Sequence, residues 1–203
     1  MNRIITLAAA IGLLLGSHTA FATDTEKQVN IRPDVPGVVV ETEDGPVTIE
    51  RIEDTDHEIT GYFAKTSRAC PPFCIQPAQA ADGVATIGEL ELLEMLADVE
   101  ARVIDARTVD WHAEETIPGS VNIPYTEIAG RLDELGCVSS AGTWDCADAV
   151  RVALYCNGLW CGQSPTAIRA MLRETYPADR IFYYRGGMQA WKILGLTTVE
   201  GGL

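Results

Sequence analysis

Residues 154–164 read LYCNGLWCGQS, and this stretch decides the fold more clearly than any other in the chain. An apolar run, residues 152–155, ends just before Cys156 and is typical of a buried strand. Ser164 and Pro165 then fit the N-cap and the first position of a helix. The sequence therefore predicts a strand, a loop that begins at Cys156, and a helix.

The elements on either side alternate in the same way. Further strands are expected at residues 103–104 and 181–183. Helices are expected near residues 86–97, 128–135, 164–172 and 187–194. Strands that alternate with helices predict an α/β domain with a central parallel sheet flanked by helices. The reactive site of such a sheet lies beyond the carboxyl ends of its strands, where Cys156 falls.

The first helix is predicted in most detail. Residues 86–89, Thr-Ile-Gly-Glu, fit a capping box and place its start there. Leu90, Leu93 and either Leu96 or Ala97 recur at helical spacing, so we expect them to form its buried stripe.

The cysteine loop has the composition of a thiolate site. A loop between a strand and a helix N-terminus directs successive backbone N–H groups to one point. A pKa of ~6.5 instead of ~8.5 raises the thiolate fraction at pH 7 from roughly 3% to roughly 75%. The amides expected to cradle the sulfur are those of Asn157, Gly158, Leu159, Trp160, Gly162 and Gln163. On spacing alone, a structural Cys156–Cys161 disulfide explains the two cysteines equally well.

The chain before this domain divides into two parts. Residues 1–22 contain Arg3, an apolar run and a small-x-small cleavage pattern ending at Ala22, which predicts a Sec-type signal peptide and an exported, periplasmic protein. The alternative is a membrane anchor, but the apolar run is short for one. Residues 23–83 form an extension with a β-hairpin around an Asp-Gly turn, and residues 84–203 form the α/β domain.

The charge of the chain excludes some partners. The formal net charge is −14, which disfavours nucleic acid and anionic membrane surfaces. No membrane span is expected after signal cleavage. An anionic substrate meets an unfavourable field, so any anion site must be built locally.

Export permits disulfides, and spacing suggests local pairs. We expect structural disulfides between Cys70 and Cys74 and between Cys137 and Cys146. A redox or metal motif at residues 70–74 is the alternative, but His57 and His112 are isolated in the sequence and complete no zinc site. No metal or cofactor is expected. Residues 70–77 are expected to pack against the domain and shape access to the loop.

Three stretches of the chain carry a resemblance to a known family. Residues 103–107 with 117–124, residues 156–164, and residues 184–191 with 195–196 resemble, in order, the signatures of single-domain rhodaneses, which are sulfurtransferases. The resemblance implies that Cys156 takes up a sulfane sulfur as a persulfide. It also implies that Asp105 and Arg107 lie near the site, for which a structural ion pair is the alternative interpretation.

The chain departs from the family pattern in several places. Thr116 replaces the usual histidine, and the loop is longer than usual. The loop contains no arginine or lysine, which weighs against thiosulfate as the natural donor and against the related phosphatases, which need a loop arginine. Cys161 is a second cysteine in the loop, and in this the chain is similar to a subgroup of exported rhodanese-like proteins that carry two loop cysteines. Trp160 is expected at the pocket rim.

These observations predict a cell-envelope sulfurtransferase that passes sulfur from Cys156 to a thiol or another acceptor. Thiosulfate, a polysulfide or a persulfide is the donor class, and a periplasmic thiol reductant is a candidate partner. Cys161 is then a candidate resolving cysteine, which attacks the Cys156 persulfide and expels hydrosulfide. A dithiol oxidoreductase that uses Cys156 and Cys161, and a catalytically silent rhodanese-fold binding module, are the two alternatives.

Overall fold

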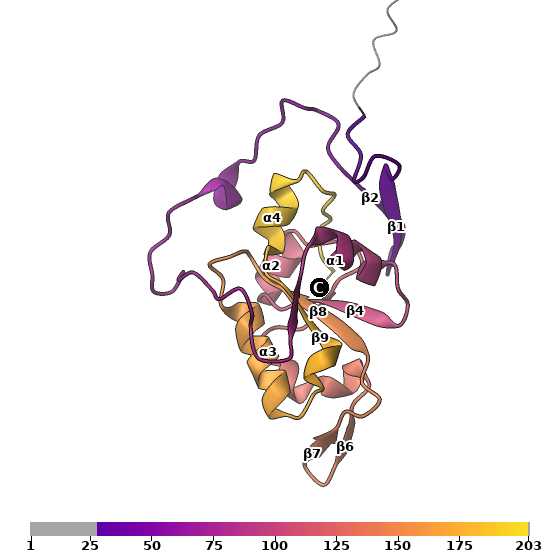
Figure 1. Cartoon of the computed structure of the whole chain (residues 1–203), viewed down its shortest axis with the longest axis vertical. Helices are drawn as coiled ribbons and strands as arrows, with labels where there is room; N and C mark the ends of the chain where they lie inside the picture. Colours follow the sequence, from indigo (N-terminus) through magenta and orange to yellow (C-terminus); the bar gives the residue numbers. More distant parts are fainter. Residues whose placement is uncertain (1–27, 203) are drawn as a thin grey trace, which may run out of the picture.

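The structure is a computed structural model and describes residues 28–202. The predicted signal peptide, residues 1–22, lies outside the described residues. A five-stranded parallel sheet in the order β3-β9-β8-β4-β5 forms the centre of the molecule (Figure 1). Its strands are β3 (Ala85–Ile87), β4 (Ala101–Asp105), β5 (Val121–Asn122), β8 (Arg151–Tyr155) and β9 (Ile181–Tyr184).

Helices cover both faces of this sheet, as the sequence predicts. The helices are α1 (Glu89–Leu96), α2 (Val109–Glu114), α3 (Gln163–Arg173) and α4 (Gly187–Ile193), with 3-10 turns η1 (Gly61–Ala64), η2 (Ile128–Gly130), η3 (Leu132–Leu135) and η4 (Ala178–Arg180). One core joins α3, η2 and η3 to the sheet. The other joins α1 and α4 to the opposite face. Residues alternate between the cores along β8, so Leu154 belongs to the first and Tyr155 to the second.

Two antiparallel hairpins are added to this sheet. The predicted N-terminal hairpin is present as β1 (Gly37–Thr42) and β2 (Gly45–Glu50), and its Val40 and Ile49 are buried in the core beside α1 and α4. A second hairpin, β6 (Val138–Ser140) and β7 (Thr143–Asp145), lies between Cys137 and Cys146, for which the sequence predicted a disulfide but no strands.

The predicted start of α1 is wrong. Thr86 pairs with Tyr183 in β3 and is therefore no helix cap. The helix begins at Glu89, and the Glu91 carboxylate accepts a hydrogen bond of 3.0 Å from the Gly88 N–H. With the helix in this phase, Leu90 is exposed and the buried side is formed by Leu92, Leu93 and Met95.

The helix expected over residues 128–135 is divided into η2 and η3. Its apolar residues Ile128, Leu132 and Leu135 are all buried, as expected. The backbone leaves the helical region at Arg131, with φ −122° and ψ 27°, directly after Gly130. Hydrophobic spacing located the buried side correctly, but it does not distinguish one α-helix from two short turns.

The predicted cap of α3 is also wrong. Gly162 is the N-cap, and Ser164 and Pro165 lie inside the first turn, where proline is tolerated because first-turn N–H groups lack an intrahelical acceptor. The Ser164 hydroxyl is therefore free for another use, which is described below.

The cysteines form two local pairs and leave two thiols. Disulfides join Cys70 to Cys74 and Cys137 to Cys146, the second closing the β6–β7 hairpin. Cys156 and Cys161, which spacing also suggested as a pair, are both buried free thiols.

The extension wraps around the domain (Figure 1). After β2 the chain passes α4 and reaches the cysteine loop before it enters the sheet at β3. The Gln76 N–H donates a 2.9 Å hydrogen bond to the Leu159 carbonyl, and Arg185 donates to the carbonyls of Gln76 and Pro77. The expected packing of residues 70–77 against the domain is therefore confirmed.

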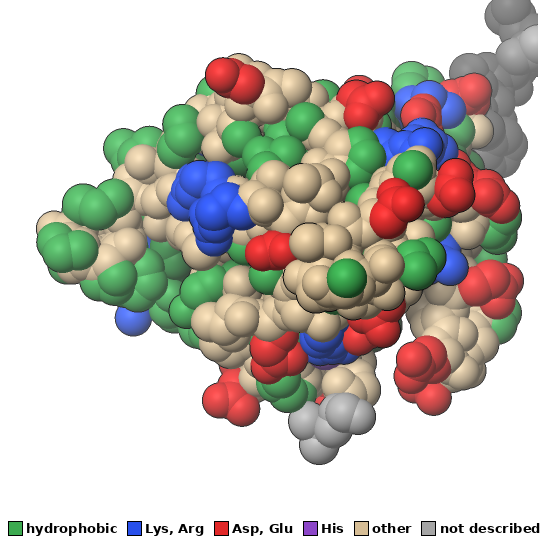
Figure 2. Space-filling model, turned by 90° about the horizontal axis from the view of Figure 1, so that it is seen from below, with side chains coloured by type: hydrophobic (Ala, Val, Ile, Leu, Met, Phe, Trp, Pro, Cys, Tyr) green, Lys and Arg blue, Asp and Glu red, His purple; other side chains and the backbone are tan. Residues whose placement is uncertain are grey.

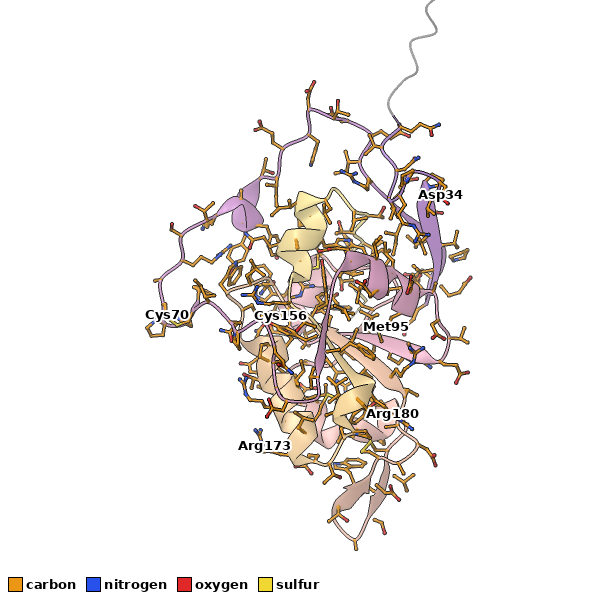
Figure 3. All side chains as sticks on the ribbon, in the orientation of Figure 1. Asp34, Cys70, Met95, Cys156, Arg173 and Arg180 are labelled. Atoms are coloured by element: carbon orange, nitrogen blue, oxygen red, sulfur yellow. A yellow bond between two sulfur atoms is a disulfide. The ribbon has the colours of Figure 1, made fainter. Side chains whose placement is uncertain are left out.

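The surface reflects the acidic composition. Figure 2 shows acidic side chains gathered at the right of the view and hydrophobic side chains predominating at the left. Figure 3 places Cys70 on this left side. Within residues 28–202, no helix combines the length and apolar character needed to cross a bilayer.

Candidate active site

Cys156 directly follows β8, at the carboxyl edge of the sheet (Figure 3). Its side chain is buried, and the residue is only 2% exposed. The Ser164 hydroxyl donates a hydrogen bond of 3.1 Å to the Cys156 sulfur, and Ser164 lies in the first turn of α3. The positive end of the α3 dipole adds to this stabilisation of a thiolate. As a thiol, Cys156 donates instead to the Cys161 carbonyl, at 3.3 Å.

The start of α4 holds the backbone of the loop. The N–H groups of Met188 and Gln189 donate to the carbonyls of Cys156 and Asn157, at 3.0 and 3.1 Å. This contact needs glycine at position 187, where φ is +56° and an added Cβ would lie 2.2 Å from the Cys156 carbonyl oxygen. With these carbonyls bonded to α4, the loop amides are free to face the sulfurs.

The two loop sulfurs have opposite tendencies to ionise. Burial raises the pKa of Cys156, but hydrogen bonds from the Cys161 thiol, the Ser164 hydroxyl and the amides of Ser164 and Gly158 outweigh it and lower the pKa to about 7. The hydrogen bond to Cys156 and burial raise the pKa of Cys161. Cys156 is therefore the thiolate of the pair and Cys161 the thiol, and the Cys161 sulfur also lies 3.5 Å from the Gln163 side-chain oxygen, to which it donates.

The amides predicted to cradle one sulfur are divided between two. The Gly158 amide faces Cys156, together with that of Ser164, which the sequence did not suggest. The amides of Asn157 and Gln163 face Cys161. The roles of the Leu159, Trp160 and Gly162 amides stay predictions.

Asp105 and Arg107 form a buried ion pair beneath the loop. Two guanidinium nitrogens of Arg107 donate to the Asp105 carboxylate, at 2.5 and 2.8 Å, and both residues are fully buried. Arg107 reaches the Asn157 side chain only at 3.5 Å. Burial alone raises the pKa of Asp105, but hydrogen bonds from Arg107 and His112 lower it further than burial raises it. The arrangement matches the structural interpretation, with one link to the loop through Asn157.

Two residues that the sequence set aside complete this network. His112 lies 3.1 Å from the Asp105 carboxylate and is thus not isolated. Thr116, in place of the family's histidine, donates to the same carboxylate at 3.0 Å and lies 2.7 Å from the Tyr155 hydroxyl.

A segment of the extension, residues 61–76, covers the loop, and we call it the covering segment. Phe73 meets the Trp160 ring edge to face, with centroids 5.3 Å apart, and Tyr62 does so at 5.9 Å. The Arg68 guanidinium lies 3.8 Å from the Trp160 ring centroid and 4.0 Å from that of Tyr62. Trp160 is therefore buried under these side chains. The expectation that it lies at the pocket rim is wrong.

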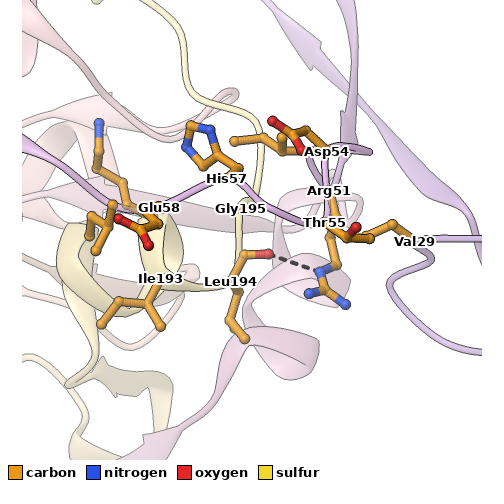
Figure 4. Close-up of a pocket in the computed structure, with 12 residues that line it drawn as sticks. Val29, Arg51, Asp54, Thr55, His57, Glu58, Ile193, Leu194 and Gly195 are labelled. Atoms are coloured by element: carbon orange, nitrogen blue, oxygen red, sulfur yellow. Dashed lines mark hydrogen bonds between the residues drawn. The ribbon is translucent and has the colours of Figure 1, made fainter.

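A separate hollow of about 590 Å³ lies between residues 51–59 and the end of α4 (Figure 4). Arg51 spans it with a 2.8 Å hydrogen bond to the Leu194 carbonyl. No cysteine lines this hollow. Among residues 28–202, no group of three or more His, Cys, Asp or Glu side chains is arranged to hold a metal ion. The two free thiols, Cys156 and Cys161, both lie in the cysteine loop.

Sequence reasoning missed several residues of this site. The sequence predicts Ser164 as a helix cap. A residue at the start of this helix can also contact Cys156, because the loop between them curls back on itself. Gly187 lies in the third rhodanese-like stretch, so a signal for it existed. Arg68 had none, because 88 residues separate it from Cys156 and only the wrapping of the extension brings it to the loop.

Fold and site together define an α/β domain with a buried cysteine thiolate at the carboxyl edge of a parallel sheet. Residues 89–194 match the family described as Rhodanese-like domain. The chain belongs to this family.

Individual relatives are more distant. The chain is 31% identical over 115 residues to an HTH-type transcriptional regulator of Mycobacterium tuberculosis; the match covers 57% of this chain and 45% of the regulator. The crystal structure of a thiosulfate sulfurtransferase from Pseudomonas aeruginosa is 24% identical, with a TM-score of 0.44 over 59% of this chain and 21% of that one. An E. coli rhodanese with anions is 23% identical, with a TM-score of 0.36 over 50% of this chain and 99% of that one.

Proposed function

We propose that this protein is a sulfurtransferase of the cell envelope, which takes a sulfane sulfur onto Cys156 as a persulfide and passes it to a thiol. The observation that carries the proposal is the 3.1 Å hydrogen bond from Ser164 to a sulfur whose pKa is lowered to about 7. A thiolate, and not a thiol, attacks sulfur. Membership of the rhodanese-like family supports the same reaction.

The loading step needs no external oxidant. The Cys156 thiolate attacks the outer sulfur of a donor, for example thiosulfate, and forms an S–S bond. The donor's own bond to that sulfur breaks, and its electron pair leaves with sulfite, or with a thiolate when the donor is an organic persulfide. The anionic Cys156 persulfide then accepts hydrogen bonds from the Gly158 and Ser164 amides and the Ser164 hydroxyl, which already face this sulfur.

The unloading step restores the enzyme. An acceptor thiolate attacks the outer sulfur of the persulfide, and the Cys156 thiolate leaves. Its low pKa makes Cys156 a good leaving group, because a leaving thiolate of lower pKa departs faster.

A dithiol oxidoreductase is the second candidate, and the presence of two free thiols, Cys156 and Cys161, in one buried cluster favours it. Cys156 would attack a partner disulfide and release one thiolate. Cys161, once deprotonated, would attack the Cys156 sulfur and expel the second thiolate, which leaves a Cys156–Cys161 disulfide. The same attack on a Cys156 persulfide would expel hydrosulfide, and a periplasmic thiol reductant would then reopen the pair.

Mass spectrometry of the reduced full-length protein separates these reactions. After treatment with polysulfide, we expect an added mass of about 32 Da on Cys156, one sulfur atom. Cys156→Ser should abolish the addition, while Cys161→Ala keeps it. A loss of about 2 Da in the wild type, together with no sulfur uptake in Cys161→Ala, would identify the oxidoreductase instead. No change in mass would identify a silent binding module, the third interpretation of the sequence.

The location in the cell envelope rests on residues 1–22. Export would deliver the protein to a compartment that permits the two disulfides of the extension and the β6–β7 hairpin. Intact mass of the protein from a periplasmic extract should begin at Thr23. Recovery of the full 203 residues from the membrane pellet would overturn this part of the proposal.

A further inference from the structure

Arg68 is a cation without a counter-ion beside the cysteine loop. Arg107, Arg131, Arg151 and Lys192 each pair with a carboxylate, whereas Arg68 takes part in none of the ion pairs found among residues 28–202. Other arginines among residues 28–202 also lack an ion pair, but Arg68 is the one whose guanidinium stacks on Trp160 of the cysteine loop. Its charge is therefore available to a ligand.

One hydrogen-bond donor of Arg68 is also unused. A terminal nitrogen donates to the Tyr62 carbonyl at 2.6 Å. The Nε atom is buried and has no partner within the part of the chain that the structure describes. A buried donor without an acceptor is costly, so this nitrogen is a candidate donor to a bound anion.

The position of Arg68 ties it to the sulfurs. Its guanidinium stacks on Trp160, and Trp160 packs in one cluster with Cys156 and Cys161. Tyr62, the second ring of the stack, borders the same cluster. The cysteine loop itself contains no lysine or arginine. The Arg107 guanidinium already donates hydrogen bonds to the Asp105 carboxylate and the Glu115 carbonyl.

The geometry points to Arg68 as the residue that recognises an oxyanion carried by the sulfur donor. The extension thus supplies a positive charge that the cysteine loop lacks. The inference rests on the proposed function. A guanidinium offers paired N–H groups that match sulfonate and carboxylate oxygens. Tyr62 packs against the buried cluster of Cys156, Trp160 and Cys161, so a donor that enters by displacing the covering segment meets Arg68. Donors with a sulfonate or carboxylate are therefore preferred over uncharged ones.

A test of anion recognition can be made without sulfur transfer. Iodoacetate and iodoacetamide alkylate Cys156 by the same displacement of iodide, but only the first carries a carboxylate. Arg68→Gln should lower the ratio of the iodoacetate rate to the iodoacetamide rate about tenfold, the loss of one charge-assisted hydrogen bond. Taking the ratio cancels any general loosening of the covering segment. Lys65→Gln is the matched control, since Lys65 lies on the same segment, 5.8 Å from the Tyr62 ring.

The ratio decides the inference whatever becomes of the proposed function. An unchanged ratio in Arg68→Gln, or an equal fall in Lys65→Gln, would show that Arg68 recognises no oxyanion. Arg68→Lys, which keeps the charge, should retain most of the wild-type ratio. Failure of the wild-type protein to take up sulfur from any donor would overturn the proposed function alone.

Sulfur loading then identifies the source of the oxyanion. Persulfide formation on Cys156 is timed with thiosulfate, with glutathione persulfide and with benzyl persulfide, which carries no sulfonate or carboxylate and releases benzyl thiolate when Cys156 takes its outer sulfur. In Arg68→Gln, loading from thiosulfate or glutathione persulfide should slow about tenfold, and loading from benzyl persulfide should not. The larger loss assigns the donor as a sulfonate or as a carboxylate. An equal loss with all three donors would contradict the inference.

Discussion

At the scale of single residues, the site depends on what surrounds one sulfur. Ser164 is placed by its sequence at a helix start, yet its hydroxyl is used on Cys156 and not on the helix. Cys161 is the second donor, and its own pKa is raised because it holds its proton toward Cys156. Two cysteines in one loop thus differ in charge because only one of them receives these bonds.

Ser164→Ala should raise the pKa of Cys156. The hydroxyl stabilises the thiolate and not the thiol, so its loss disfavours the charged form. A hydrogen bond to a charged group contributes about 1.5–3 kcal/mol, so the midpoint of the pH profile should move from near 7 up by about one pH unit or more. The measurement is the rate of Cys156 alkylation by iodoacetamide between pH 5 and 10.

Ser139→Ala, in the exposed β6 strand, is the control and should leave the profile in place. A profile for Ser164→Ala that coincides with the wild type would show that the hydroxyl does not stabilise the thiolate.

At the scale of elements, the cysteine loop is held between two helix starts. The first turn of α3 supplies donors to the sulfur, and the first turn of α4 binds the carbonyls of Cys156 and Asn157. Gln189 extends this hold, because its side chain accepts from the Trp160 indole at 2.9 Å and donates to the Phe63 carbonyl at 2.8 Å. The loop is therefore preorganised by elements on both sides of it in the chain.

Gly187→Ala should disrupt this hold. The new Cβ would collide with the Cys156 carbonyl, and φ at this position is +56°, where side chains are strained. Strain and overpacking together predict a loss of about 2 kcal/mol or more in the free energy of unfolding, measured by urea denaturation. Alkylation of Cys156 at pH 7 should also change.

Gly130→Ala is the matched control, because an added Cβ there meets nothing within 4 Å. Its stability should stay within about 1 kcal/mol of the wild type. Equal stability of the two variants would mean that α4 and the loop can separate without cost.

At the scale of the whole molecule, the extension and the family domain form one site. The hairpin β1–β2 contributes Val40 and Ile49 to the core around α1 and α4, so the extension is anchored there. From that anchor the chain carries Tyr62, Arg68 and Phe73 over the cysteine loop. Access to Cys156 is therefore governed by residues outside the stretch that matches the family.

Phe73→Ala should expose Cys156. An aromatic pair of this geometry contributes about 0.5–1.5 kcal/mol, so the open state should gain about two- to tenfold in population, and alkylation by iodoacetamide should quicken accordingly. Ile75→Ala is the control, since Ile75 is 85% exposed and belongs to the same segment. Equal rates in the two variants would show that Phe73 does not keep the loop covered.

Sequence alone predicted the elements and pairings that depend on neighbours along the chain, although not the starts of α1 and α3. Apolar runs such as residues 152–155 and the start of α4 predicted the parallel sheet and its helices, and the strand–loop–helix order placed Cys156 at the sheet edge. The Cys70–Cys74 and Cys137–Cys146 pairs followed from spacing. These features are local, because burial along one strand or the reach of one short loop determines each of them.

Tertiary structure decided the rest. The partners of Asp105 come from α2 and from Thr116, and the arginine that stacks on Trp160 of the cysteine loop comes from the extension. The phase of α1 followed from its contact with the sheet and not from the residues that resemble a cap. Hydrophobic spacing predicts which side chains are buried. It does not predict which donors and acceptors will pair in the folded protein. That choice is made when distant segments pack, because each buried donor and acceptor then has to find its partner.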